Sequence, residues 1–457
     1  MRCKIRATYT FLFFLMAVMA CQPEQTNNMQ EDQSLLTIES KIVRDQVGGM
    51  KTAFLSAEDQ DSLVWVNMKF RFGNEQNLMN RDVAGDFAGQ LLIKGTQHRN
   101  GAELEQVFKD LGANVNVTGN VYSASVSMEV ESENLYEALN VLQEVLREPA
   151  YSKDEFEAHK QEILTIVGDF KDDASSIAGR RMGQYMNRLP AGHPNYSGSL
   201  EESLKAIGAV TLDETKAFYK DFYGASNVEI TVVGNVDRAE MNNWLDTSFG
   251  DWESPSPFKK VAIPYEEIPP IRESISFPVK AKANIGARQN LPMSQDHPDY
   301  PALLLGAYIL GNPAYQESRL ANIYNDHPDG DRLMSVFFSD PIEQLGGFMV
   351  FGNFESANLK QIEEVFDTEV ARFISEGFTQ EEVEGAQAHW LASREYLRTN
   401  YSRLASHINN GLFSGRTLQW DADLENRMKA LTPEDISNAV KRHIKPEAMS
   451  VISAGRF

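Results

Sequence analysis

Apolar and polar residues alternate along the first half of the chain with two different periods. Residues 63–72 alternate with a period of two after the first positions, which predicts a strand. Apolar residues at helical spacing predict helices, and residues 113–118 and 121–130 predict a hairpin around Gly119-Asn120. The expected helices cover residues 82–94, 101–111, 133–147 and 153–187, and a closing strand covers residues 228–233.

The second half repeats this order of elements. A proline-rich linker over residues 254–270 separates the two halves. After the linker we expect strands, a helix, two more strands, two long helices and a final strand. The helices cover residues 300–310, 359–375 and 380–399, and the later strands cover residues 332–338, 347–354 and 449–454.

The repeat is visible in the residues as well as in their order. One series consists of residues 210–214, then a helix, then residues 227–234. The second half contains a parallel series: residues 431–435, then a helix, then residues 448–455. In both copies a threonine caps the helix and acidic residues follow it. We therefore predict an α+β protein with two homologous α/β sandwich domains, each an antiparallel-rich sheet with helices packed on one face. The domains cover residues 36–253 and 271–457.

The first residues of the chain differ in kind from the rest. A basic start precedes nine apolar residues, Phe11–Met19, a run too short to span a membrane. Val18-Met-Ala-Cys21 then resembles the end of a bacterial lipoprotein signal, which implies that Cys21 is lipidated. Residues 1–20 are then a signal peptide and residues 21–35 a polar, flexible tether. The alternative is cleavage after Ala20 that leaves the Cys21 thiol free.

Localisation and redox chemistry follow from the same segment. We expect an exported lipoprotein of the cell envelope, and Gln22 after the cysteine favours the outer membrane, at its periplasmic face or at the cell surface. The only cysteines are Cys3 and Cys21, and Cys3 leaves with the signal peptide. The mature chain therefore cannot form an internal disulfide.

The charge of the chain limits its partners. The sequence has 65 acidic and 43 basic residues and a net charge of −22 at pH 7. This balance argues against nucleic-acid binding, which needs a basic surface for the phosphates. It is compatible with basic peptides as partners, and also with a charge that only keeps the protein soluble.

An ordered series of short motifs resembles one family. It begins with Phe70-Arg-Phe-Gly73, Leu91-Leu-Ile-Lys-Gly-Thr96 and Leu111-Gly-Ala-Asn114. It continues with Pro149-Ala-Tyr-Ser152, His193-Pro-Asn-Tyr196, Val232-Val-Gly-Asn235, Phe249-Gly-Asp-Trp252 and, in the second half, Gln316-Glu-Ser-Arg-Leu320. Over residues 36–457 the series resembles a half-molecule of the insulinase/pitrilysin-type (inverzincin) zinc peptidases.

Active members of that family hold zinc through H-x-x-E-H, on the helix that runs into Lys-Gly-Thr. Two histidines one turn apart bind the metal, and the glutamate acts as general base on its water. Counting back from Lys94-Gly-Thr96 places the three positions at Asp86, Gly89 and Gln90. The resemblance therefore implies a degenerate motif without the histidine ligands and without the base.

The third ligand of the family is a glutamate on a later helix. Alignment on Lys171-Asp-Asp-Ala174 places it at Ile166, with Glu162 close by. A single carboxylate together with Asp86 would make a poor zinc site. No two of the eight histidines share one helical turn, so no local zinc signature exists. We expect no cofactor in this chain, and zinc only in a partner subunit.

The far half of the family's active site supplies an arginine and a tyrosine that bind substrate and polarise its carbonyl. The corresponding positions here fall on Tyr324 and, approximately, on Met334. Tyr324 and Arg332 have the right chemistry in the reverse order, so they are weak candidates for substrate binding. The alternative is a solvated loop with ordinary polar residues.

Half-molecules of this family commonly pair, one carrying the zinc and the other completing a closed chamber. The leading hypothesis is a catalytically inactive partner subunit in a heterodimer with a zinc-bearing homologue, enclosing and positioning peptide substrates. One alternative is a peptide-binding or scaffold lipoprotein with no peptidase partner. Another is an active zinc metalloendopeptidase with a rearranged site.

Overall fold

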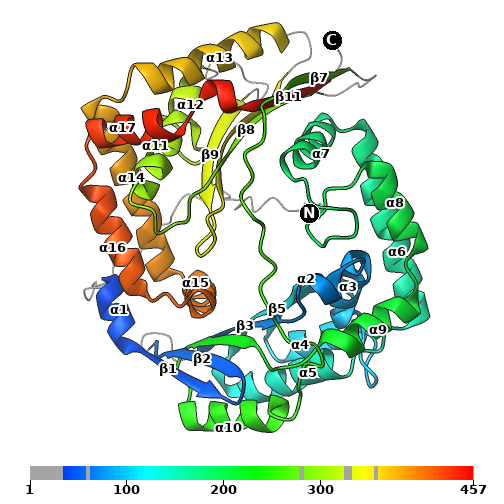
Figure 1. Cartoon of the computed structure of the whole chain (residues 1–457). Coiled ribbons are helices and arrows are strands. Elements are labelled where there is room, and N and C mark those ends of the chain that lie inside the picture. The colour runs from blue at the N-terminus through cyan, green and yellow to red at the C-terminus, as the bar shows by residue number, and fades with distance from the viewer. Residues whose placement is uncertain (1–33, 58–61, 277–281, 324–331, 355–358, 456–457) are drawn as a thin grey trace.

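The computed structural model describes residues 34–57, 62–276, 282–323, 332–354 and 359–455. The predicted signal peptide, most of the tether, Cys21 and Tyr324 lie outside these residues. Two sheets organise the fold (Figure 1). The first has the order β1-β2-β6-β3-β5-β4 and contains β1 (Ile42–Val47), β2 (Met50–Leu55), β3 (Leu63–Arg71), β4 (Asn114–Gly119), β5 (Ser123–Glu131) and β6 (Val228–Val233).

The second sheet repeats the topology of the first. Its order is β7-β11-β8-β10-β9, with β7 (Arg272–Ser276), β8 (Ala283–Leu291), β9 (Arg332–Ser339), β10 (Gly346–Phe354) and β11 (Ser450–Gly455). In each sheet one pair is parallel, β2 with β6 and β7 with β11, and the other pairs are antiparallel. The two sheets confirm the prediction of two α/β domains.

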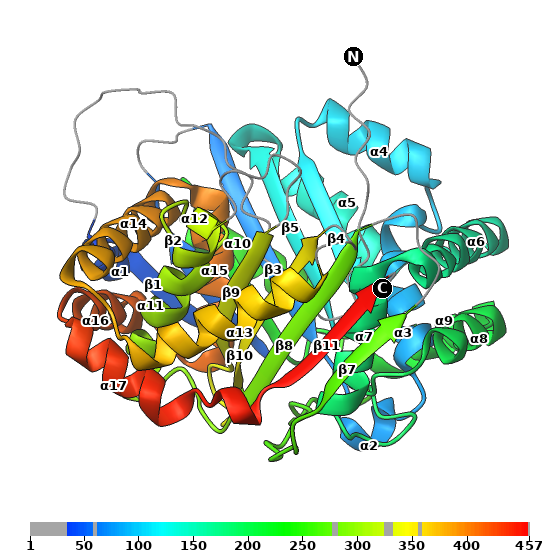
Figure 2. The ribbon, with the colours of Figure 1, turned by 90° about the horizontal axis from the view of Figure 1, so that it is seen from above.

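Helices surround the two sheets. In the first half they are α1 (Leu35–Lys41), α2 (Glu75–Leu78), α3 (Asp82–Gln90), α4 (Gly101–Asp110), α5 (Leu135–Arg147), α6 (Lys153–Asp169), α7 (Ala174–Met186), α8 (Leu200–Ala209), α9 (Leu212–Phe222) and α10 (Arg238–Phe249). In the second half they are α11 (Tyr300–Gly311), α12 (Arg319–Ile323), α13 (Leu359–Ser375), α14 (Gln380–Thr399), α15 (Tyr401–Ser414), α16 (Leu418–Lys429) and α17 (Pro433–His443). Figure 2 shows α13 crossing the strands of the second sheet on its outer side.

The two halves exchange a helix, which the sequence did not predict. The apolar side of α15, Leu404, Ala405, Ile408 and Leu412, is buried against β2, β3 and β6 of the first sheet. The side chains of Ala174, Ala178, Met182 and Met186 of α7 form a stripe that packs on β11 of the second sheet. Burial of each large apolar side chain is worth about 1.5–3 kcal/mol. A helix from the other half therefore packs on the second face of each sheet.

The prediction of one continuous helix over residues 153–187 is wrong. α6 ends at Asp169, a short 3-10 turn follows over Phe170–Asp172, and α7 begins at Ala174. The side chain of Asp173 accepts a hydrogen bond from the N–H of Ser176 at 2.7 Å and caps α7. Such an N-cap stabilises the start of a helix by about 1 kcal/mol. This break separates α7 from α6 and lets α7 reach the second sheet.

The helix expected over residues 82–94 is also shorter than predicted. α3 ends at Gln90, and a 3-10 turn occupies Leu92–Lys94 before Gly95. The φ of Gly95 is +148°, a value that favours glycine, and Gly95 ends the 3-10 turn. None of the helices in the described residues combines the length and apolar character needed to cross a bilayer.

Candidate functional site

α3 carries the three positions of the degenerate motif, and it lies against the turn of the β4–β5 hairpin. Two glycines, one helical turn apart, face that hairpin. A Cβ atom on Gly85 would lie 2.7 Å from the Cα of Val121, and one on Gly89 would lie 2.3 Å from the Cα of Gly119. Packed atoms do not approach a backbone so closely. The position of the family's general base therefore has no room for any side chain.

Asp86, at the first ligand position, interacts with the same hairpin. Its Oδ1 accepts a hydrogen bond from the N–H of Val121 at 3.2 Å. Burial, together with the charge of Asp82 one turn earlier, raises the pKa of Asp86 to about 7. Near neutral pH this carboxyl group is therefore partly protonated, and the protonated form does not bind metal ions.

Gln90, at the second ligand position, bonds to a buried histidine that the sequence analysis did not single out. Its Oε1 lies 2.7 Å from Nε2 of His159 on α6. His159 is 4% exposed, and its ring packs edge-on against Phe87 with 5.0 Å between the centroids. Burial lowers the pKa of His159, so the ring is neutral and donates its Nε2–H to the amide. The bond ties α3 to α6.

The sequence contained a signal for this histidine. Phe156, His159 and Ile163 follow helical spacing, and all three are buried on one face of α6. Ile166, the predicted third ligand position, is half-buried on the same helix and offers no ligand atom. Glu162 is largely exposed, with its Oε2 3.7 Å from Nδ1 of His159. Around α3, the described residues bring no three metal ligands together.

The weak candidates for substrate binding stay predictions. Tyr324 lies outside the described residues, and only the backbone of Arg332, which begins β9, is described. Met334 lies two residues further along β9, is half-buried, and pairs with Phe351 of β10. The structure therefore places Arg332 and Met334 at one sheet edge without testing their role.

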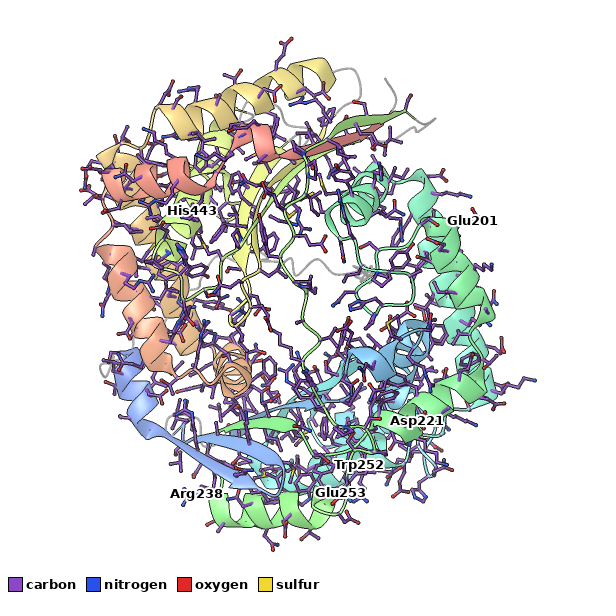
Figure 3. All side chains as sticks on the ribbon, in the orientation of Figure 1. Glu201, Asp221, Arg238, Trp252, Glu253 and His443 are labelled. Carbon is purple, nitrogen blue, oxygen red and sulfur yellow. The ribbon has the colours of Figure 1, made fainter. Side chains whose placement is uncertain are left out.

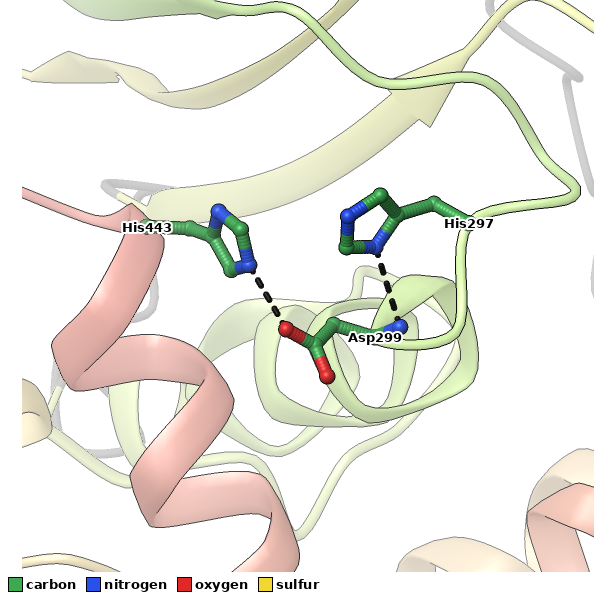
Figure 4. Close-up of side chains that lie close together, drawn as sticks. All are labelled: His297, Asp299 and His443. Atoms are coloured by element: carbon green, nitrogen blue, oxygen red, sulfur yellow. Dashed lines mark hydrogen bonds and ion pairs between the residues drawn. The ribbon is translucent and has the colours of Figure 1, made fainter.

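One group of three potential metal ligands does occur in the described residues, in the second half. His297, Asp299 and His443 offer ligand atoms within 4.8 Å of one another (Figure 4). His443 ends α17, among the helices of the second half (Figure 3). Its Nε2 lies 2.7 Å from Oδ2 of Asp299, and the guanidinium of Arg442 bonds to the same oxygen. His443 lies far along the chain from His297 and Asp299, so this cluster forms only by folding.

The hydrogen bonds of this cluster disfavour a metal ion. Nδ1 of His297 accepts the backbone N–H of Asp299 at 3.0 Å, which puts the ring proton on Nε2. Burial would raise the pKa of Asp299, but the hydrogen bonds from His443 and Arg442 hold it below its usual value. Nδ1 of His193 accepts the N–H of Asn195 in the same way, also at 3.0 Å. Both histidines begin a His-Pro-x-Tyr turn, so the shared role of the ring is to brace that turn.

Comparisons with known proteins agree with this architecture. Residues 54–192 match the family described as Insulinase (Peptidase family M16), and residues 209–389 match the Peptidase M16 inactive domain. A probable mitochondrial-processing peptidase subunit beta of Schizosaccharomyces pombe is 21% identical over 84% of each chain. The non-peptidase homolog YmxG of Helicobacter pylori is 19% identical over 83% of this chain and 86% of the relative.

Solved structures show the same fold. A peptidase M16 inactive domain from Pseudomonas fluorescens superposes with a TM-score of 0.79 at 21% identity, over 91% of this chain and 98% of that one. A protease from Helicobacter pylori gives a TM-score of 0.73 at 16% identity, over 91% and 99% of the two chains. The two family matches, taken with the altered residues on α3, show that the chain belongs to the insulinase family of peptidases, family M16, as a non-catalytic member.

Proposed function

We propose that this protein is the inactive partner subunit of a zinc-bearing homologue, and that the two chains together enclose and position peptide substrates. The contact between Gly89 and Gly119 carries this proposal. It fills the position of the general base with backbone, while both sheets of the half-molecule keep their topology. The fold is kept although the position of the general base is closed. Such a fold is suited to form part of a chamber around the zinc site of another chain.

The names of two relatives support the proposal. The Schizosaccharomyces pombe relative is named a subunit of a processing peptidase, and the Helicobacter pylori relative is named a non-peptidase homolog. An inactive chain of this fold that works in an assembly would combine both properties. We further propose that the lipid on Cys21 holds the assembly at the cell envelope, where the tether would give it reach.

Recovery of the protein from its native envelope tests the pairing. The full-length protein, tagged at its C-terminus, is extracted with mild detergent, and the recovered chains and zinc are quantified. We expect a homologue with an intact H-x-x-E-H motif at equal stoichiometry, with zinc in proportion to that homologue. The variant Cys21→Ser serves as the control for the anchor, because it should lose membrane attachment and keep the partner. Reproducible absence of such a homologue would favour the scaffold alternative.

Peptide cleavage by the purified chain tests the lack of activity. The purified chain is incubated with a mixed peptide library, with and without a metal chelator. We expect no chelator-sensitive cleavage. Chelator-sensitive turnover by this chain alone would contradict the proposal and support the rearranged zinc site.

A further inference from the structure

The second sheet has an inner face that its own helices do not cover. On the covered face, Nε2 of Gln289 donates to the carbonyl of His443 at the end of α17. On the opposite face, the side-chain amides of Asn284 and Asn290 in β8 bond to Ser175 and to the carbonyl of Met186, at the two ends of α7. Successive side chains of a strand alternate between faces. Arg288 therefore lies on the inner face, between these two asparagines.

Arg288 has no counter-charge among the described residues. Its Nε donates to Oδ1 of Asn290 at 2.9 Å, and its guanidinium carbon lies 5.3 Å from the ring centroid of Phe338. No described carboxylate is within ion-pair distance of it, and no described group accepts a hydrogen bond from its terminal nitrogens. The side chain is half-buried, and burial lowers the pKa of Arg288 to about 10. An uncompensated, partly desolvated cation costs folding free energy.

The first sheet shows what is missing around Arg288. β8 pairs with β11 as β3 pairs with β6, and Arg288 stands opposite Ser450. In the first sheet the corresponding pair is Lys69 opposite Glu229. Glu229 also accepts a hydrogen bond from Arg71 at 2.7 Å, so the cations of that face share a buried carboxylate. The repeat of residues 227–234 and 448–455 places Ser450 where Glu229 stands.

On the side toward β9, the surroundings of Arg288 are apolar and partly exposed. Met334, Val336 and Phe338 occupy alternate positions of β9 on the inner face, and Phe351 of β10 stands beside Met334. All four side chains are half-buried. Arg288, a cation beside these apolar side chains, fits a ligand that has apolar side chains and one negative charge.

We infer that Arg288 binds a carboxylate of a peptide that lies on the inner face of the second sheet, an inference that rests on the proposed enclosure of peptides. The terminal nitrogens of an arginine can donate two parallel hydrogen bonds to one carboxylate. The peptide carboxylate takes the role that Glu229 has in the first sheet. It comes either from the C-terminus of the peptide or from an Asp or Glu side chain.

Binding of three labelled peptides to the purified full-length protein tests this inference. The probes are a fluorescein-labelled heptapeptide of leucine and alanine with a free C-terminal carboxylate, the same peptide as its C-terminal amide, and that amide with one internal glutamate. Fluorescence anisotropy gives each Kd. We expect at least one of the two carboxylate peptides to bind roughly tenfold to a hundredfold more tightly than the plain amide, as for hydrogen bonds to charged groups. Preference for the first or the third peptide identifies the source of the carboxylate.

Variants of this position separate a binding role from a structural one. Arg288→Met should abolish the preference for a carboxylate, keep the affinity for the amide, and raise the Tm, because it removes an unpaired charge. Ser450→Glu should also abolish the preference, because it supplies the carboxylate from within the chain. Arg272→Met is the matched control, since Arg272 lies on the same sheet but is paired with Asp367 at 2.6 Å. It should keep the preference.

Two results would overturn the inference: a carboxylate preference that survives in Arg288→Met, and a wild-type protein that binds none of the three peptides. Neither result decides the pairing with a zinc-bearing homologue, which the recovery experiment measures independently. Arg288→Met should recover that homologue as well as the wild type does.

Discussion

The inner faces of the two sheets have the same strand topology but differ in how their cations are paired. In the first sheet, Glu229 is buried between cations, with Arg71 bonded to it and Lys69 directly across from it. In the second sheet, Arg288 stands opposite Ser450 and has no carboxylate beside it among the described residues. A duplicated scaffold can thus keep its strands while one copy satisfies its charges internally. The other copy leaves a charge for a ligand.

Removal of the carboxylate of the first sheet should have the largest effect. Glu229→Gln leaves the half-buried Arg71 and Lys69 without a counter-charge, and such a loss costs about 3 kcal/mol. Urea unfolding of the purified protein measures it. Ser450→Ala is the matched control in the second sheet and should cost less than about 1 kcal/mol. Equal costs for the two variants would remove the contrast between the sheets.

The closed position on α3 should give the next largest effect. Gly89→Ala places a Cβ against the Cα of Gly119, which forces α3 away from the hairpin and should destabilise the protein by about 2 kcal/mol. Gly168→Ala on α6 is the control, because a Cβ there meets nothing within 4 Å. It should stabilise the protein by about 0.5 kcal/mol through helix propensity. A Gly89→Ala protein as stable as the wild type would show that the base position is open.

The contrast between the halves was only partly accessible from the sequence. The duplication and the linker follow from local patterns, and the degenerate positions before Lys94-Gly-Thr96 follow from the family resemblance. None of these needs knowledge of distant contacts. The closure of Gly89 on Gly119 and the bond from His159 to Gln90 join elements that are far apart in the chain. No sequence signal pointed to Arg288 as a binding residue, because an arginine between Ala287 and Gln289 is an ordinary polar position in an alternating strand.

The pH dependence of stability should report the ionisation of the half-buried carboxyl of Asp86. Its pKa is raised to about 7, so the folded state holds a proton that the unfolded state loses at its ordinary value near 3.8. Stability therefore falls as pH rises through this window, and the penalty is complete above pH 7. Asp86→Asn removes the penalty and can still accept the N–H of Val121. Its stabilisation should be larger at pH 8 than at pH 5 by roughly 1–2 kcal/mol, allowing for partial solvation.

Thermal unfolding at the two pH values measures this difference. Asp82→Asn is the comparison, because burial also raises the pKa of Asp82, one turn earlier on α3. It should act in the same direction. The same gain from Asp86→Asn at pH 5 and pH 8 would mean that Asp86 is ionised throughout.

The smallest effects should come from the two His-Pro-x-Tyr turns, where the halves are alike. In both turns Nδ1 of the histidine, His193 or His297, accepts the backbone N–H two residues later at 3.0 Å. An asparagine can offer an oxygen to the same N–H, so His193→Asn and His297→Asn should each cost about 1 kcal/mol of stability.

Added zinc should shift the Tm of the wild type no more than that of His297→Asn. A zinc-dependent rise of Tm that His297→Asn and His443→Gln both abolish would instead make the cluster of the second half a metal site. The second half would then bind a metal that the first has lost.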